Sequence, residues 1–312
     1  MNRYGRPFSA TAALLLAAVA IIGYLAGNSE STSASRATLL TLSAGNVVLE
    51  YPSNWQRTSA VPAIPGLALA KATALAPRGD GAQAGLLVGQ LPEGEPGPLP
   101  ESFVAQLDQL PDAEVVDLIE IQAYKYAQPG IRGFNRKLTV YAIPNPDGGG
   151  TVLACYAPAR SSGYMRACQQ IVATAILSGQ PQLYRLTPEP AFARELGAAL
   201  GALDARRVAL RRELDTRATP ATAQRLAAGL AEAFASAGTS LSALEPLPAT
   251  HQAQAMLSDS LSRAREAYDA LAAAAADKST ARFAVARTQV YEAEASVSSA
   301  LERFALLGYQ QR

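Results

Sequence analysis

The chain has 312 residues, of which 17% are charged and 49% are hydrophobic, and this composition favours packed cores over disorder. Its formal net charge is +1, so electrostatics give no case for a nucleic acid partner. About 280 residues follow the first apolar stretch, which is enough for two domains of ordinary size.

An uncharged, apolar stretch covers residues 8–25 and follows Arg3 and Arg6. At about 1.5 Å per residue it spans roughly 27 Å, which is close to the hydrocarbon thickness of a bilayer. Because the two arginines favour a cytoplasmic N-terminus, the sequence predicts a cytoplasmic stub and transmembrane anchor over residues 1–27, followed by a linker over 28–38. The protein would then be a single-pass protein of the cell membrane, with the bulk of its chain extracytoplasmic.

A cleaved signal peptide is the alternative interpretation of the same stretch. The apolar part of a signal peptide usually has about 7–15 residues, and the best cleavage position, after Ala37, lies well beyond the apolar end. These lengths favour an uncleaved anchor. Both interpretations place the rest of the chain outside the inner membrane.

Alternating apolar and polar residues predict a first strand over residues 46–51. A short turn follows it, and Trp55 directly after the turn is predicted to anchor the core rather than to stack on a ligand. Two further strands are predicted over 67–76 and 85–91, separated by a turn that is rich in glycine and proline.

A short helix is predicted over residues 100–110, where apolar residues recur at i, i+4 and i+7. The apolar-rich segment 115–127 is predicted as one strand. The clearest hairpin pairs residues 138–143 with 151–156. Glycines in its turn also occur in phosphate-binding loops, but no helix follows them, so they predict a turn alone.

The two cysteines, Cys155 and Cys168, belong to the returning strand of this hairpin and to a helix predicted over residues 163–177. In an oxidising compartment this placement predicts a disulfide, and the alternative is a pair of buried free thiols. Closing a loop of this size stabilises a fold by roughly 3 kcal/mol in the chain-entropy model. A metal site is poorly supported, because the single histidine, His251, is distant in the sequence.

The segment from Glu50 to Trp55, the hairpin over 138–156 and the closing helix over 168–177 resemble the Mog1/PsbP-like α/β/α sandwich. The resemblance covers residues 39–180. That family includes photosystem accessory proteins, a nuclear-transport accessory protein and many exported bacterial proteins. The resemblance implies a binding or accessory module, and it carries over no catalytic residue.

Proline-containing sequence over residues 181–187 predicts a linker, after which Ala, Leu, Arg and Glu dominate. Four helices with apolar residues at 4-3 spacing are predicted over 188–312. Their seams carry Leu196, Leu200, Leu203, Arg207, Leu210 and Leu214; Leu226, Leu230, Phe234, Ala237 and Leu241; Leu257, Leu261, Ala264, Tyr268, Leu271 and Ala275; and Phe283, Ala286, Val290, Ala293, Val297, Ala300, Phe304 and Leu307. Short connections favour a four-helix up-down bundle or a helical-hairpin domain. The expected fold class is α+β, an antiparallel-sheet sandwich followed by a bundle that folds independently.

Four arginines, Arg206, Arg207, Arg211 and Arg212, form a basic cluster with acidic residues among them. The pattern predicts a solvated, internally paired helix face rather than an anion site, with Arg211 exposed. Arg207 falls on the apolar seam, where its stem can reach the bundle edge. His251 is predicted to be an exposed residue of a first helical turn.

Tyr124, Tyr126 and Tyr141 are predicted to form an aromatic patch on the sheet, as amphipathic residues of the core edge rather than a ligand platform. The sequence predicts no catalytic, cofactor-binding or metal-binding residue and no cofactor. Beyond the disulfide cysteines, it therefore assigns no site residue.

Export, two packed domains and the lack of a coherent acid, base or metal set predict a non-enzymatic, membrane-anchored binding or accessory protein with a protein partner in the cell envelope. The alternative is a small-ligand receptor or an enzyme whose site is dispersed over the α/β domain. A third hypothesis is a structural spacer that sets a distance from the membrane. A pocket lined by convergent polar groups would favour the second hypothesis, and an apolar patch above about 600 Å² the first.

Overall fold

The computed structural model describes residues 38–60, 62–79, 83–92, 97–145, 149–178, 184–216 and 219–309. The predicted anchor over residues 8–25 and almost all of the predicted linker over 28–38 lie outside these residues. Residues 40–312 cluster as one compact unit, which contains the sheets and helices apart from the first residue of one strand. Within the described residues, no helix is both long enough and apolar enough to span a membrane.

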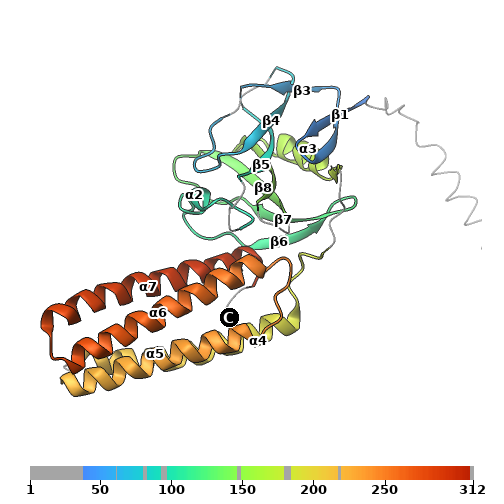
Figure 1. Cartoon of the computed structure of the whole chain (residues 1–312). Coiled ribbons are helices and arrows are strands. Elements are labelled where there is room, and N and C mark those ends of the chain that lie inside the picture. The colour runs from blue at the N-terminus through green and yellow to red at the C-terminus, as the bar shows by residue number, and fades with distance from the viewer. Residues whose placement is uncertain are drawn as a thin grey trace, which may run out of the picture. The chain divides into compact units, whose positions relative to one another are not determined.

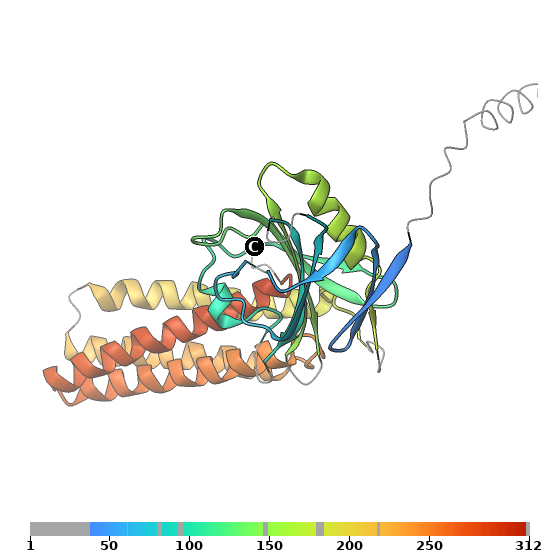
Figure 2. The same cartoon turned by 90° about the horizontal axis from the view of Figure 1, so that it is seen from above.

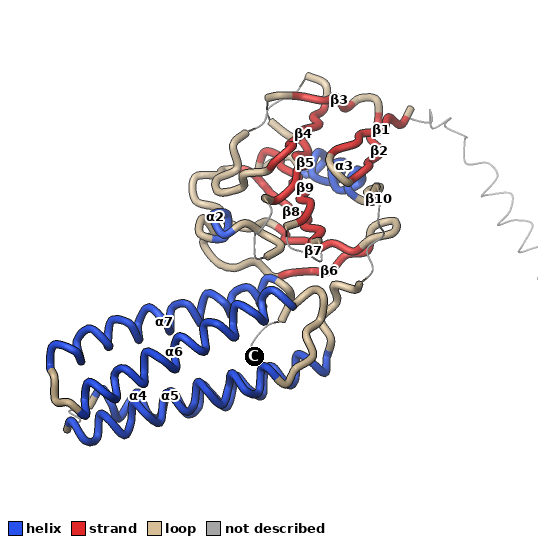
Figure 3. The backbone as a smooth tube through the Cα atoms, in the orientation of Figure 1, coloured by secondary structure: helices blue, strands red, loops and turns tan. Residues whose placement is uncertain are grey.

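In the part of the chain that the structure describes, ten strands form two sheets. Figures 1 and 3 show how the strands are arranged. The larger sheet is antiparallel and has seven strands in the order β3-β4-β5-β9-β8-β7-β6. Its strands are β3 (Trp55–Thr58), β4 (Ala70–Pro77), β5 (Gly85–Leu91), β6 (Ala113–Asp117), β7 (Gln122–Ala127), β8 (Arg136–Pro144) and β9 (Gly150–Pro158). The smaller sheet has the order β1-β2-β10 and contains β1 (Leu39–Ala44), β2 (Val47–Pro52) and β10 (Ile176–Leu177).

The predicted hairpin is confirmed as β8 and β9, which pair from Arg136 opposite Pro158 to Pro144 opposite Gly150. The predicted single strand over residues 115–127 is wrong. It is a hairpin of β6 and β7, in which Asp117 lies opposite Gln122. The Leu118 N–H donates to the Ile121 carbonyl at 2.8 Å and closes a tight turn that an apolar run does not reveal.

The helix predicted over residues 163–177 is shorter than expected. Helix α3 covers Ser162–Val172, and the following residues turn away to form β10, where Ile176 lies opposite Val48. The Thr174 hydroxyl accepts the Glu50 N–H at 2.9 Å, so a side chain beyond the helix holds the chain on β2. Such side-chain bonds compete with helical ones and favour a helix end. Helix α2 is also shorter than predicted, covering only Glu101–Val104.

All four predicted C-terminal helices are confirmed: α4 (Pro190–Asp215), α5 (Pro220–Ser242), α6 (His251–Ala276) and α7 (Thr280–Leu306). Each packs along its neighbour in the sequence, α4 on α5, α5 on α6 and α6 on α7 (Figure 1). The start of α5 has the expected signals, because Pro220 occupies its first turn and the Thr219 hydroxyl accepts the Thr222 N–H at 3.3 Å. The structure is therefore α+β, with antiparallel sheets followed by four long packed helices.

The larger sheet is buried on both faces. One face packs against the smaller sheet and α3 (Figure 2). The core on this face includes Trp55, Leu153 and Cys155. The opposite face packs against α2 and the long helices, and its core runs without a break from Tyr126 on β7 to Phe304 on α7. Period-two alternation sends neighbouring residues of one strand to these two different cores.

The predicted division into domains over residues 39–180 and 188–312 stays a prediction. Residues 181–183 of the linker predicted over 181–187 lie outside the described residues, and Leu186 near its end is buried in the core shared by sheet and helices.

Candidate functional site

The predicted disulfide is confirmed. Cys155 on β9 and Cys168 on α3 are bonded, with their Cα atoms 5.8 Å apart, inside the range that disulfides require. Both residues are fully buried in the core beneath α3. A structural disulfide of this kind indicates an oxidising, extracytoplasmic location.

A polar network crosses the interior of the helical region. The Tyr268 hydroxyl on α6 donates to Glu294 Oε1 on α7 at 2.6 Å, and Arg211 Nη1 on α4 donates to the same hydroxyl at 2.9 Å. The Arg211 guanidinium also lies 5.5 Å from the centre of the Tyr291 ring, a cation–π distance. Three helices are therefore joined by one chain of hydrogen bonds.

The surroundings of this network explain the direction of its pKa shifts. Burial raises the pKa of Tyr268, and the hydrogen bond to Glu294 raises it further, so this hydroxyl stays a donor at neutral pH. Burial acts to lower the pKa of Arg211, but Tyr268 and Glu294 beside it raise that pKa on balance. The network consists of a permanent cation, a donor and an acceptor that already satisfy one another, which favours a structural role over proton transfer.

The predicted exposure of Arg211 is therefore wrong, since only 21% of its side chain is exposed. The other arginines of the cluster lie nearer the solvent. Arg207 pairs with Asp204 at 2.9 Å, the predicted i,i+3 pairing, whereas Arg206 pairs with Glu232 on α5 at 2.6 Å. Exposed pairs of this type contribute little to stability.

A groove of about 620 Å³ lies between α4 and α7. Leu196 and Leu200 line it from α4, and Phe304 lines it from α7. Near the sheet the Tyr309 ring packs edge-on against Phe192 at 5.4 Å, beside the groove. A hollow of about 130 Å³ shares the α4 residues Leu200 and Asp204 with the groove. It is also lined by Glu294 of the polar network and by Arg207, whose guanidinium lies 4.0 Å from the Glu294 carboxylate.

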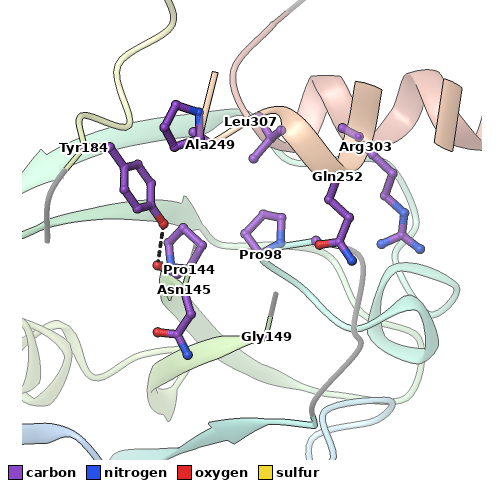
Figure 4. A pocket seen from close by; sticks show the side chains of 12 residues that line it. Pro98, Pro144, Asn145, Gly149, Tyr184, Ala249, Gln252, Arg303 and Leu307 are labelled. Carbon is purple, nitrogen blue, oxygen red and sulfur yellow. Dashed lines mark hydrogen bonds between the residues drawn. The ribbon is translucent and has the colours of Figure 1, made fainter. Parts of the chain in front are cut away.

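A second hollow lies where the loop before α2 meets the long helices (Figure 4). Its volume is about 30 Å³, room for a water molecule or two rather than for a metabolite. The Tyr184 hydroxyl on its wall donates to the Pro144 carbonyl at 2.8 Å (Figure 4). Arg303, only 3% exposed, donates to the Leu99 carbonyl at 3.4 Å and fastens α7 to this loop.

The predicted aromatic patch is wrong in one of its three members. Tyr124 and Tyr126 share the face toward the long helices, whereas Tyr141 belongs to the core of the opposite face. The Tyr126 hydroxyl donates to the Leu306 carbonyl of α7 at 2.6 Å, and the Tyr124 hydroxyl donates to the Leu186 carbonyl at 3.3 Å. Burial raises the pKa of both hydroxyls, so both remain donors that tie the sheet to the helical region.

The remaining candidates from the sequence are placed as expected. His251 is exposed at the first position of α6, and Trp55 is buried in the core. Among the described residues, no group of three or more histidine, cysteine, aspartate or glutamate side chains is arranged to hold a metal ion. The polar network was missed at the sequence level, although a signal existed: Arg207 and Tyr268 interrupt apolar seams, and polar groups in a seam need partners.

Comparison with known proteins gives no relative, since no family model, no curated protein and no solved structure matches the chain. The Mog1/PsbP-like resemblance of residues 39–180 therefore stays a prediction. What the chain does has to be inferred from its own residues and their geometry.

Proposed function

We propose that the chain is a membrane-anchored, extracytoplasmic binding or accessory protein without catalytic activity, and that its partner is another protein of the cell envelope. The Cys155–Cys168 disulfide supports the compartment, because such bonds persist in oxidising surroundings. The apolar stretch over residues 8–25 supports the anchor, with the N-terminus in the cytoplasm. Within residues 39–180, α3 on one face of the large sheet and α2 on the other are in keeping with an α/β/α sandwich.

The observation that carries the binding role is the position of exposed apolar side chains. Of the six large hydrophobic residues exposed in the described part of the chain, three lie on α4 and α7: Val208, Val285 and Tyr291. These helices also form the groove, whereas α5 and α6 contribute none of the six. Aromatic and apolar side chains on a surface are typical of protein interfaces.

Site-specific photocrosslinking in intact cells tests the binding role. A photoreactive residue at position 291 on α7 should capture one reproducible envelope protein. The matched control is the same residue at position 273 on α6, where the native Ala273 is also exposed but the helix carries no exposed large hydrophobic side chain. Equal capture from both positions, or capture from neither, would contradict a binding face on α7.

Extraction of membranes with alkaline carbonate tests the anchor. The chain should stay in the pellet, and protease added outside intact spheroplasts should digest residues beyond the anchor. Release into the supernatant at a mass that lacks the first 37 residues would support the signal-peptide alternative, in which the partner role remains but the anchor does not.

The small-ligand or enzyme alternative requires a site in the sheet domain. The hollow beside Arg303 borders the sheet, and its volume of about 30 Å³ is far below the roughly 300–1,000 Å³ of typical ligand pockets. The larger groove has a volume within that range, but it lies on the helices rather than in the sheet domain. A site in the sheet domain is therefore less well supported than a partner that binds a surface.

A further inference from the structure

Two glycines lie on the exposed side of α4, and no contact within the chain requires glycine at either position. A Cβ atom built on Gly197 or on Gly201 would meet nothing within 4 Å, so alanine fits at both positions. On α5, a Cβ on Gly238 would likewise meet nothing, whereas one on Gly229 would press on the Leu210 side chain at 3.3 Å. Glycine inside a helix is destabilising relative to alanine, and its usual benefit is close approach of another backbone.

The glycines belong to a second stripe on α4, separate from the apolar seam that faces α5. The stripe repeats at 4-3-4-3-4 spacing and contains Pro190, Arg194, Gly197, Gly201, Asp204 and Val208, all exposed. At about 100° per residue these positions fall within roughly 80° of the helix circumference. Arg194, Gly197, Gly201 and Asp204 also line the groove of about 620 Å³. The stripe therefore has the pattern of a helix-packing face that no helix of the chain occupies.

The charges in this stripe are self-complementary. Arg194 precedes Gly197 by three residues, and Asp204 follows Gly201 by three residues. Suppose that a second α4 crosses the first antiparallel, with the two-fold axis between the glycines. Each Gly197 then faces Gly201 of the other copy. Each Arg194 likewise faces Asp204 of the other copy. Val208, 56% exposed, then meets Pro190 of the other copy, so an exposed apolar residue also gains an apolar partner.

We propose that the chain forms a two-fold symmetric homodimer in which two copies of α4 pack antiparallel through this stripe. Isologous interfaces require that one surface be complementary to itself, and a stripe with opposite charges at equal distances from its centre meets that condition. Asp204 already accepts Arg207 at 2.9 Å, but 63% of its side chain is exposed, so its carboxylate has room for a second guanidinium. The proposal does not depend on the partner-binding role, and because it places Val208 in the dimer interface, the exposed apolar residues left for an envelope partner are Val285 and Tyr291 on α7.

The mass of the full chain in detergent, measured by light scattering after size exclusion, tests the dimer. The unaltered chain should have the protein mass of two copies at micromolar concentration. Gly201→Leu should reduce it to one copy while leaving the helical circular dichroism unchanged, because a Cβ atom at this position meets nothing within 4 Å inside the monomer. Gly238→Leu on α5 is the matched control, since its Cβ also meets nothing within 4 Å, and it should leave the dimer intact.

Charge reversal tests the pairing itself. Arg194→Asp or Asp204→Arg alone should weaken self-association by at least about tenfold, because like charges then face each other at both ends of the interface. When the two variant chains are mixed, opposite charges face each other again and a heterodimer should form. Recovery on mixing also shows that neither variant is misfolded.

Three outcomes would overturn the proposal. The first is a monomeric mass for the unaltered chain at tens of micromolar. The second is a dimer that survives Gly201→Leu, which would place the interface elsewhere. The third is a pair of charge variants that do not recover when mixed, which would show that Arg194 and Asp204 do not face each other across the axis.

Discussion

The two faces of the seven-stranded sheet are closed in different ways. One face is covered by the three-stranded sheet and by α3, and a disulfide fastens α3 to β9. The other is covered by α2 and by the long helices, and hydrogen bonds such as that from Tyr126 to the Leu306 carbonyl join the two regions. We refer to these as the disulfide face and the helix face.

The two contacts that fasten these faces span very different distances along the chain. Cys155 and Cys168 are 13 residues apart, whereas Tyr126 and Leu306 are 180 residues apart. The entropy lost on closing a loop grows with its length, so the contact of α3 with β9 costs less to close than that of β7 with α7, although β2 joins the disulfide face across 124 residues, from Glu50 to Thr174. Helix formation has a costly nucleus, so packing of the long helices on one another supplies most of their stability.

The single tryptophan makes this difference measurable. Trp55 lies in the core of the disulfide face and is 2% exposed, so its fluorescence reports on that face alone. Most helical residues belong to α4, α5, α6 and α7, so far-ultraviolet circular dichroism reports mainly on the helical region. Two probes therefore separate the two regions during unfolding.

The largest effect is expected from Leu261→Asp on α6. Leu261 is 1% exposed, and an unpaired carboxylate in its place should destabilise the helical region by more than about 4 kcal/mol. The helical signal should be lost at room temperature while Trp55 emission stays that of a buried indole. If Trp55 becomes exposed in the same variant, the two faces unfold as one unit.

The isolated fragment 188–312 tests whether the helical region folds without the sheet. It should show helical circular dichroism and a cooperative melt, because the four seams bury one another without the sheet. Its melting temperature should be lower than that of the full chain, since Leu306 and its neighbours lose their contacts with the sheet. A disordered fragment would show that the helices depend on the sheet and that the predicted domain division is wrong.

Replacing both cysteines, as Cys155→Ala with Cys168→Ala, should act on the disulfide face alone. The chain-entropy model gives a loss of about 3 kcal/mol for a loop of this length. In guanidinium chloride, the Trp55 transition should move to a lower midpoint while the helical transition keeps its midpoint. A common shift of both transitions would show that the disulfide also supports the helix face.

Arg211→Ala on α4 should destabilise the helical region by about 1–2 kcal/mol, because it removes a charged donor from the partly buried Tyr268 hydroxyl. The matched control is Arg212→Ala at the next, exposed position, which should change stability by less than about 0.5 kcal/mol. Both are measured by denaturant melts of the helical signal. Equal effects of the two variants would mean that the network is dispensable.

Much of this fold follows from local patterns in the sequence. Four seams at 4-3 spacing predicted the long helices, period-two alternation predicted β8 and β9, and the position of Cys168 on an apolar helix face predicted the disulfide. What local patterns did not reveal depends on distant partners. Beyond the end of α3, Thr174 bonds to Glu50 on β2, and Arg211 on α4 is held by Tyr268 and Glu294 from other helices.

The candidate site was less predictable than the fold. The groove exists because α4 and α7, the first and last of the four helices, leave space between them. The apolar spacing within each helix does not specify how closely these two helices approach each other. The glycines on α4 were visible in the sequence, but their lack of contacts was not. The split of residues 115–127 was hidden for a related reason, because Ile119 is apolar and yet 63% exposed in the turn.

The smallest effect, and the most direct comparison of the two faces, comes from removing one tyrosine hydroxyl on each. Tyr126→Phe leaves the buried carbonyl of Leu306 without its donor at 2.6 Å, which should cost about 1 kcal/mol. Tyr141→Phe removes a hydroxyl on the opposite face of the sheet, where the structure gives it no hydrogen bond to the described residues, and should cost less than about 0.5 kcal/mol.

The probe that responds should also differ. Tyr126→Phe weakens a contact between β7 and α7, so it should lower the midpoint of the helical transition and leave the Trp55 transition unchanged. Because both variants remove the same atom from a buried ring, the difference between them isolates the hydrogen bond to α7 from the loss of the hydroxyl itself. Indistinguishable variants would mean that apolar packing alone holds the helices on the sheet, and that the bond from Tyr126 contributes orientation without stability.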